Sequence, residues 1–79
     1  MVTAESIKQS IEQGMTVVHL TVAGDGQHFE AVVVSEEFAG KSRVQRHQRV
    51  FQTLGDRMRE EIHALSMKTF TPQEWQEQQ

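Results

Sequence analysis

The amino-acid sequence predicts an α+β fold in the order α-β-β-α-α-β-α, with a three-stranded sheet that carries its helices on one face. Three observations lead to this fold class. In residues 16–22 successive side chains fall on two opposite faces, with the period of two that is typical of strands. Residues 29–34 form a second run, rich in β-branched residues. A glycine-rich turn between these runs indicates a hairpin. Elsewhere, helix-capping residues precede apolar residues spaced by three and four.

The first helix is expected over about residues 3 to 13. Thr3 can cap its first turn, and Ile7 and Ile11 follow at helical spacing. Gly14 suits the left-handed conformation that commonly follows the last turn of a helix. We therefore expect an amphipathic helix at the start of the chain.

The hairpin is predicted to be antiparallel. The side chains on the two faces of its first strand are Val18, Leu20 and Val22, and Val17, His19 and Thr21. Gly24 and Gly26, on either side of Asp25, can adopt the positive φ angles of a tight reversal. The second strand then returns over residues 29–34, so His28 should stand at the hairpin tip.

Residues 38–54, with the sequence FAGKSRVQRHQRVFQTL, contain the central helix. Ser42 and Gln45 form an S-x-x-Q capping box, so this helix should begin at about Arg43. Its apolar stripe, expected to face the core, contains Val44, His47, Val50, Phe51, Leu54 and Met58. Its outer face is expected to carry Arg43, Arg46 and Arg49, which with Lys41 form a basic patch on an acidic molecule.

Three further elements complete the predicted order. A short helical turn precedes the central helix at residues 36–38, and Gly55 is a weak point at which that helix bends or restarts toward Glu61. Residues 63–70 are expected to form the third strand. Residues 71–74 form a second capping box with proline at the first helical position, and they open a short helix that carries Trp75.

The composition limits the function of the chain. Its 79 residues are sufficient for one small domain, residues 1–79. Without cysteine, the chain alone can form no disulfide, thiolate nucleophile or cysteine-based metal site. A net charge of −3 argues against broad electrostatic binding of nucleic acid. The longest apolar run, residues 31–34, is too short to span a membrane, and no signal-peptide pattern is found, so a cytoplasmic protein is expected.

No catalytic residues are predicted. None of the carboxylates has a position that isolates it from water, and capping roles account for the serines and threonines. The chain is therefore expected not to be an enzyme.

The four histidines are the residues most suited to bind a metal. His47 lies on the predicted apolar stripe, where a buried, hydrogen-bonded imidazole is expected, and His19 lies mid-strand in a solvent-facing or interface position. If His28 pairs with Ala23, it is four residues from His19, or roughly 13 Å, so these two cannot share an ion. His63 follows two glutamates. From the residues alone, His28 and His63 are ordinary surface histidines.

The basic helix also suggests binding of nucleic acid. The order of the elements is that of a KH domain, which clamps single strands with a G-x-x-G loop. Here the corresponding loop, residues 39–42, reads Ala-Gly-Lys-Ser and has only one glycine. A solvated helix face or a protein-docking surface is the favoured interpretation. The residues predicted for partner or nucleic-acid binding are Lys41, Arg43, Arg46 and Arg49.

Two motifs, FAGKSRVQRH in the middle and IHALSMKTFTPQEW at the end, resemble the BolA family over nearly the whole chain. The Gly-Asp-Gly-Gln-His-Phe turn is most similar to the short bacterial branch called IbaG or YrbA. The resemblance implies one BolA-like domain with a class II KH-like fold. It also implies complexes with monothiol glutaredoxins of the CGFS type, in which glutathione and both proteins hold a bridging [2Fe-2S] cluster.

The resemblance also implies the ligands. The family's C-terminal histidine ligand corresponds to His63, and the ligand of its first hairpin loop, which is histidine or cysteine in different branches, corresponds to His28. Imidazole can replace thiolate on one iron, as in Rieske centres. The isolated chain is expected to bind no cofactor.

We therefore expect a non-enzymatic accessory factor in iron–sulfur cluster assembly or trafficking. The alternative is a DNA-binding, stress-response transcription regulator that uses the basic helix over residues 41–54, because the family is also associated with such roles. The isolated chain is expected to be a monomer, with a homodimer through a sheet edge as the other arrangement. No membrane partner is expected.

Overall fold

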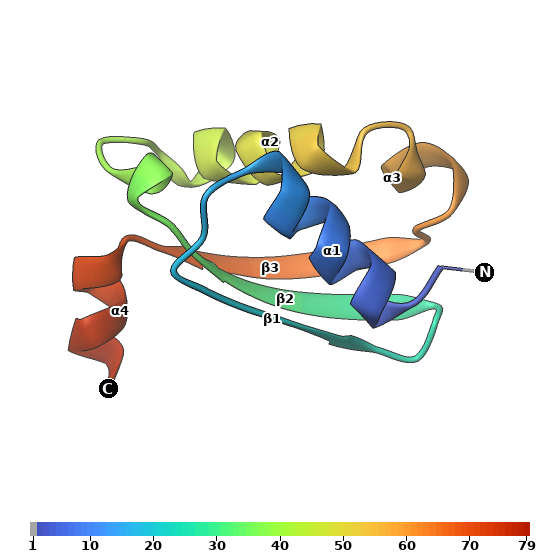
Figure 1. Ribbon diagram of the computed structural model, residues 1–79, viewed down its shortest axis with the longest axis horizontal. Helices are drawn as coiled ribbons and strands as arrows, with labels where there is room; N and C mark the ends of the chain where they lie inside the picture. The colour runs from blue at the N-terminus through green and yellow to red at the C-terminus, as the bar shows by residue number, and fades with distance from the viewer. Residues whose placement is uncertain (1) are drawn as a thin grey trace.

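The chain folds into a three-stranded sheet covered on one face by all of its helices except the last, which lies at one end of the sheet, as Figure 1 shows for a computed structural model that describes residues 2–79. The predicted α+β class and order of elements are confirmed. The helices are α1 (Ala4–Gly14), α2 (Arg43–Leu54), α3 (Arg57–Glu60) and α4 (Pro72–Gln78), with a 3-10 turn η1 (Glu36–Phe38) before α2. The strands are β1 (His19–Gly24), β2 (His28–Val34) and β3 (Ala64–Phe70).

The sheet is mixed and has the order β1-β2-β3. The β1–β2 hairpin is antiparallel, as predicted, and its register pairs His19 with Val34. β3 runs parallel to β2 and pairs Val34 with Phe70. A parallel neighbour requires a crossover connection, and here η1, α2 and α3 make it over the helical face of the sheet (Figure 1).

Predicted capping signals begin three of the helices. The hydroxyls of Thr3, Ser42 and Thr71 each accept a hydrogen bond from the backbone three residues later, in complete capping boxes. Gly55 ends α2 with φ 56°, a conformation that favours glycine, so α3 is a separate turn.

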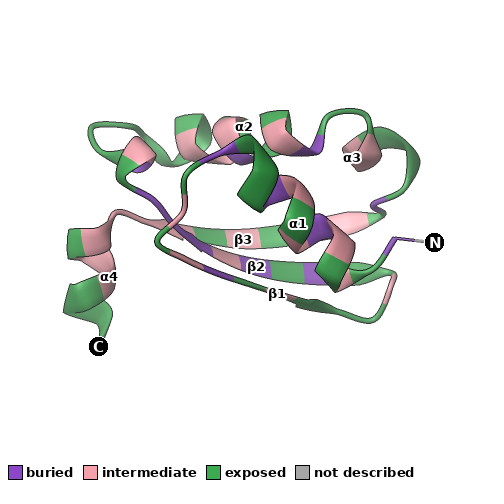
Figure 2. Cartoon of the chain, in the orientation of Figure 1, coloured by how far each residue is buried: buried purple, intermediate pink, exposed green. Residues whose placement is uncertain are grey.

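The core lies between the sheet and the helical layer (Figure 2). β2 contributes Phe29, Ala31 and Val33, which alternate along the strand and face the helices. α1 contributes Ile7 and Ile11, both fully buried. α2 contributes Val50 and Leu54, and the core is completed by Phe38 and Ile62 among others.

The predicted buried face of α2 is wrong at two positions. Val44 and Phe51 are 63% and 36% exposed, whereas Val50 and Leu54 are buried. The inward face continues one turn earlier to Arg46, whose side chain is only 13% exposed. The inward side of α2 is therefore the row of residues spaced by four, Arg46, Val50 and Leu54, and not the wider apolar stripe. Arg46 can lie there because the Thr69 carbonyl and the Glu74 carboxylate accept its hydrogen bonds.

Two expectations for the first third of the chain are also wrong. Gly14 does not adopt a positive φ. Its role is spatial, because a Cβ atom there would lie 2.8 Å from the Thr53 side chain, so glycine allows α1 to approach α2 closely. Val18 is 61% exposed, since β1 begins only at His19 and Val18 lies outside the strand.

No helix among residues 2–79 has the length and hydrophobicity needed to cross a membrane.

Candidate functional site

The structure brings the starts of β2 and β3 together at one end of the sheet, on the right in Figure 1. His28 is the first residue of β2 and pairs with Ala64, the first residue of β3. His63 directly precedes Ala64, so the two histidines that sequence analysis selected lie on adjacent chain segments. Both are exposed. The backbones of the two histidines therefore lie close together at this end of the sheet.

The hairpin turn fixes the backbone of His28. The Asp25 carboxylate accepts hydrogen bonds from the backbone N–H groups of Gln27 and His28, at 2.9 and 3.0 Å. These bonds, that from His28 first, hold the pKa of Asp25 below its usual value. Gly26, with φ 99°, completes the reversal. The loop is thus held by backbone contacts, while the imidazole of His28 extends beyond them.

The expected pairing of His28 with Ala23 is wrong, because Ala23 pairs with Glu30 and the Asp25 N–H donates to the His28 carbonyl. His19 lies opposite Val34 at the far end of β2. The spacing is therefore greater than expected, roughly 20 Å at about 3.3 Å per residue. These two histidines cannot share a metal ion.

The imidazole of His28 lies on the sheet face away from the helices, because it alternates with the buried Phe29. Its Nε2 atom is 3.4 Å from the Ser66 hydroxyl. This long contact leaves the other ring nitrogen, Nδ1, available to an external ligand. Sequence reasoning missed Ser66, since only the parallel register of β3 places it near the hairpin.

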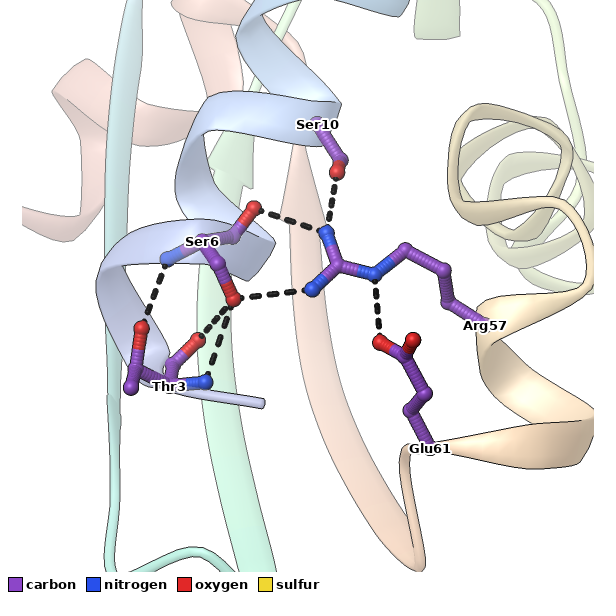
Figure 3. Close-up of polar contacts among 5 residues, drawn as sticks. All are labelled: Thr3, Ser6, Ser10, Arg57 and Glu61. Atoms are coloured by element: carbon purple, nitrogen blue, oxygen red, sulfur yellow. Dashed lines mark hydrogen bonds and ion pairs between the residues drawn. The ribbon is translucent and has the colours of Figure 1, made fainter. Parts of the chain in front are cut away.

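The segment that carries His63 is anchored by Arg57 (Figure 3). The guanidinium donates to the Ser6 carbonyl, the Ser6 hydroxyl and the Ser10 hydroxyl of α1, at 3.1, 2.9 and 2.6 Å. It also pairs with Glu61 at 3.0 Å. Ile62, which precedes His63, is buried and donates its N–H to the Arg57 carbonyl. Sequence reasoning did not identify this anchor; the i, i+4 spacing of Arg57 and Glu61 was its one local signal.

No group of three or more His, Cys, Asp or Glu side chains in the described part of the chain, residues 2–79, could hold a metal ion. The imidazoles of His28 and His63, at the end of the sheet here called the histidine end, are therefore an incomplete ligand set. A metal centre here would need donors from another molecule.

At the opposite end of the sheet, two of the three arginines of α2, Arg46 and Arg49, are not free on an outer face, contrary to the sequence-based expectation, whereas Arg43 is exposed as expected. Arg46 forms a two-pronged ion pair with Glu74 of α4, at 2.7 and 3.2 Å. This contact, with the Thr71 backbone N–H, lowers the pKa of Glu74 to about 2. Arg49 pairs with Glu37 at 2.9 Å and donates to the Gly14 carbonyl.

Glu37 has two strong donors of its own. The backbone N–H of Thr16 donates to its carboxylate at 2.7 Å, and Arg49 donates to the other oxygen. The hydrogen bond from Thr16, followed by that from Arg49, holds the pKa of Glu37 below its usual value. Of the predicted binding residues, only Lys41 and Arg43 form no ion pair within residues 2–79.

The remaining two histidines belong to this second end. His19 stacks on Trp75 with ring centroids 4.9 Å apart, and Phe70 packs on the same indole at 5.3 Å. His47 is half-buried, not fully buried as expected, and burial followed by the Arg43 charge lowers its pKa. His19 thus holds α4 on the sheet, and the surroundings of His47 disfavour its charged form.

The comparisons with known proteins agree with one another. The family model described as BolA-like protein matches residues 1–74. The DNA-binding transcriptional regulator BolA of Vibrio cholerae is 48% identical over 60 residues, which cover 76% of this chain and 57% of that protein. The acid stress protein IbaG of Escherichia coli is 37% identical over 70 residues, 87% of this chain and 83% of that protein.

A solved structure shares both the sequence and the fold. The BolA protein homologue from Coxiella burnetii is 47% identical, with a TM-score of 0.83 over 96% of this chain and 99% of that chain. The chain spans less than two thirds of the Vibrio protein, so the likeness to that relative concerns part of its length.

Proposed function

The chain belongs to the BolA-like family, and from this premise we propose that it is a non-enzymatic accessory factor in iron–sulfur cluster assembly or trafficking. It binds a monothiol CGFS glutaredoxin and donates His63 and His28 to a [2Fe-2S] cluster shared with that partner and with glutathione.

The observation that carries the proposal is the parallel register of β2 and β3, which makes His28 and His63 neighbours at an exposed end. The donor set fits such a centre, because two imidazoles can ligate one iron of a [2Fe-2S] cluster. Since the chain has no cysteine, the second iron must take its sulfur ligands from the partner and from glutathione.

The chain's own residues hold the two donors in place. Asp25 fixes the backbone of His28, and Arg57 with the buried Ile62 fixes the segment before His63. Both imidazoles remain exposed, which a ligand shared with a second protein requires. The cluster supplies the electron-accepting iron pair, and the protein contributes position and ligand type.

The test uses a cluster-loaded CGFS glutaredoxin with glutathione, mixed with the wild-type chain, and follows visible absorption and circular dichroism. The wild type should change both spectra. His63→Ala should abolish the change, and His28→Ala should weaken it. His28→Cys should retain a cluster with a shifted spectrum, because thiolate replaces imidazole. His47→Asn is the matched control. Identical spectra for wild type and His63→Ala would falsify the ligand assignment.

A second candidate is a DNA-binding regulator, as the Vibrio relative is named. Lys41 and Arg43 beside the start of α2 could contact phosphates. Arg46 and Arg49 are engaged with Glu74 and Glu37, which reduces the charge available. This function predicts salt-dependent, specific duplex binding that Arg43→Ala removes. Equal binding of unrelated duplexes would exclude it.

A further inference from the structure

β3 is an edge strand, because β2 is its one neighbour in the sheet of residues 2–79. The Phe70 carbonyl accepts from the Ser35 N–H on the β2 side at 3.0 Å. Alternation then directs the backbone groups of Leu65, Met67 and Thr69 away from β2. The Thr69 carbonyl accordingly accepts from Arg46 at 3.5 Å. The outward donors and acceptors of β3 are arranged as for a further strand.

A groove runs along this edge. One cavity of about 360 Å³ lies between the start of α2 and the end of β3. A second, of about 280 Å³, lies along the middle of β3 and reaches Val32 of β2. Arg43, Met67 and Lys68 line both cavities, so the two adjoin along β3, and together they are here called the β3-edge groove.

The charge of the β3-edge groove differs from that of the whole molecule, which is −3. Lys41, Arg43 and Lys68 line it, and Glu30 is the one acid among its lining residues. Arg46 also lines it, but Glu74 neutralises its charge. His47 and Met67 add apolar surface between the cations. A ligand that suits these walls carries negative charge and small apolar side chains.

We propose that the β3-edge groove binds an extended, acidic peptide segment of a partner protein, which adds to β3 as a fourth strand. Outward backbone groups on alternate residues match the hydrogen-bonding repeat of a peptide. The cations add selectivity for acidic side chains. The groove runs from the middle of β3 to its carboxyl end, and Ser66, which lines it, is the residue it shares with the surroundings of His28.

Two other occupants fit less well. A second copy of the chain would bring the same cations against each other, and charge on an edge strand is a common protection against such pairing. A nucleic acid would gain from free arginines and stacking aromatics. The arginines Arg46 and Arg49 are paired, and Phe70, the aromatic residue of the groove, packs on Trp75.

The test uses a fluorescein-labelled octapeptide, Glu-Val-Glu-Val-Asp-Val-Glu-Thr, and follows its anisotropy with increasing protein. Two matched peptides carry N-methyl groups on either the odd or the even amides. Because a strand pairs through alternate residues, one methylated peptide should bind like the parent and the other should lose at least roughly ten-fold in affinity. Backbone amides of Leu65, Met67 and Thr69 should exchange more slowly with solvent when the peptide is bound.

Charge reversals locate the site. Arg43→Glu and Lys68→Glu should each weaken binding of the parent peptide roughly ten-fold at low salt, whereas Arg59→Glu on α3 should change it less than about two-fold. Equal affinity of both methylated peptides, no binding, or slowed exchange along β1 instead of β3 would overturn the proposal. Tighter binding of an octathymidylate would assign the groove to nucleic acid, and a salt-sensitive dimer in sedimentation would assign it to a second copy.

Discussion

The two ends of the sheet use polar side chains in opposite ways. At the end formed by η1, β3 and α4, Arg46 pairs with Glu74, and His19 stacks on Trp75. At the end formed by the hairpin turn and the start of β3, hydrogen bonds fix the backbone and leave His28 and His63 exposed. Side chains that have partners within the protein stabilise the fold. Exposed side chains on a backbone that is itself held by hydrogen bonds are the candidates for binding.

The strongest test of this comparison sets Arg46 against Arg43. Arg46→Met should lower the free energy of unfolding by about 1–3 kcal/mol, because several acceptors lose a largely buried charged donor. Arg43→Met, which breaks no ion pair, should stay within about 0.5 kcal/mol of wild type. Urea unfolding followed by circular dichroism measures both. Equal losses would show that internal contacts do not distinguish these arginines.

A smaller effect is expected at the aromatic contact that holds α4. Trp75→Leu should cost about 1 kcal/mol, because the stack with His19 and the contact with Phe70 are lost while some apolar area remains. Thermal unfolding gives the change, and Gln76→Leu on the exposed side of α4 is the matched control. A Trp75 variant as stable as that control would contradict a structural role for His19.

Acid should weaken the α4 end further. The folded pKa of Glu74 is about 2, below its ordinary value of 4.5, so its contribution is complete above pH 4.5 and is lost as the pH falls toward 2. Urea unfolding should therefore show that the free energy of unfolding falls between pH 5 and pH 2.5, and that it falls less in Glu74→Gln than in the wild type. Glu77→Gln should lose as much unfolding free energy between pH 5 and pH 2.5 as the wild type does. If both variants behave alike, Glu74 is not the source of the pH dependence.

The smallest change is expected at the histidine end. His28→Ala and His63→Ala should each alter the free energy of unfolding by less than about 0.5 kcal/mol, because both side chains are exposed. Two-dimensional NMR spectra should match the wild type away from the substituted residues. A loss of more than about 1 kcal/mol would mean that the imidazoles support the fold and would remove the contrast between the two ends.

Local features of the fold could be predicted from sequence because their causes are local. The capping boxes at Ser42 and Thr71, the glycine break after Leu54 and the reversal around Asp25 each involve residues within a few positions of one another. The period of two over residues 16–22 and the β-branched run over residues 29–34 likewise reflect the local preferences of a strand. These signals were sufficient for the order of the elements.

The side-chain partners could not be predicted, because they come from distant parts of the chain. Arg46 and Glu74 are 28 residues apart, and no periodicity on α2 reveals that α4 will return there. For the same reason, sequence analysis predicted that Val44 and Phe51 are buried and that Arg46 is exposed. For the candidate site, sequence analysis supplied His28 and His63 through a family resemblance, while their adjacency depends on the parallel direction of β3.

The position of α4 has a practical consequence for experiments. The last helix lies at the end of the sheet remote from His28 and His63, whereas the first turn of α1 contacts Arg57 near that site (Figure 1). A polyhistidine purification tag placed before α1 would introduce competing imidazoles beside His28 and His63. The same tag placed after α4 would keep them roughly a strand's length away, so metal titrations should use carboxyl-terminal fusions.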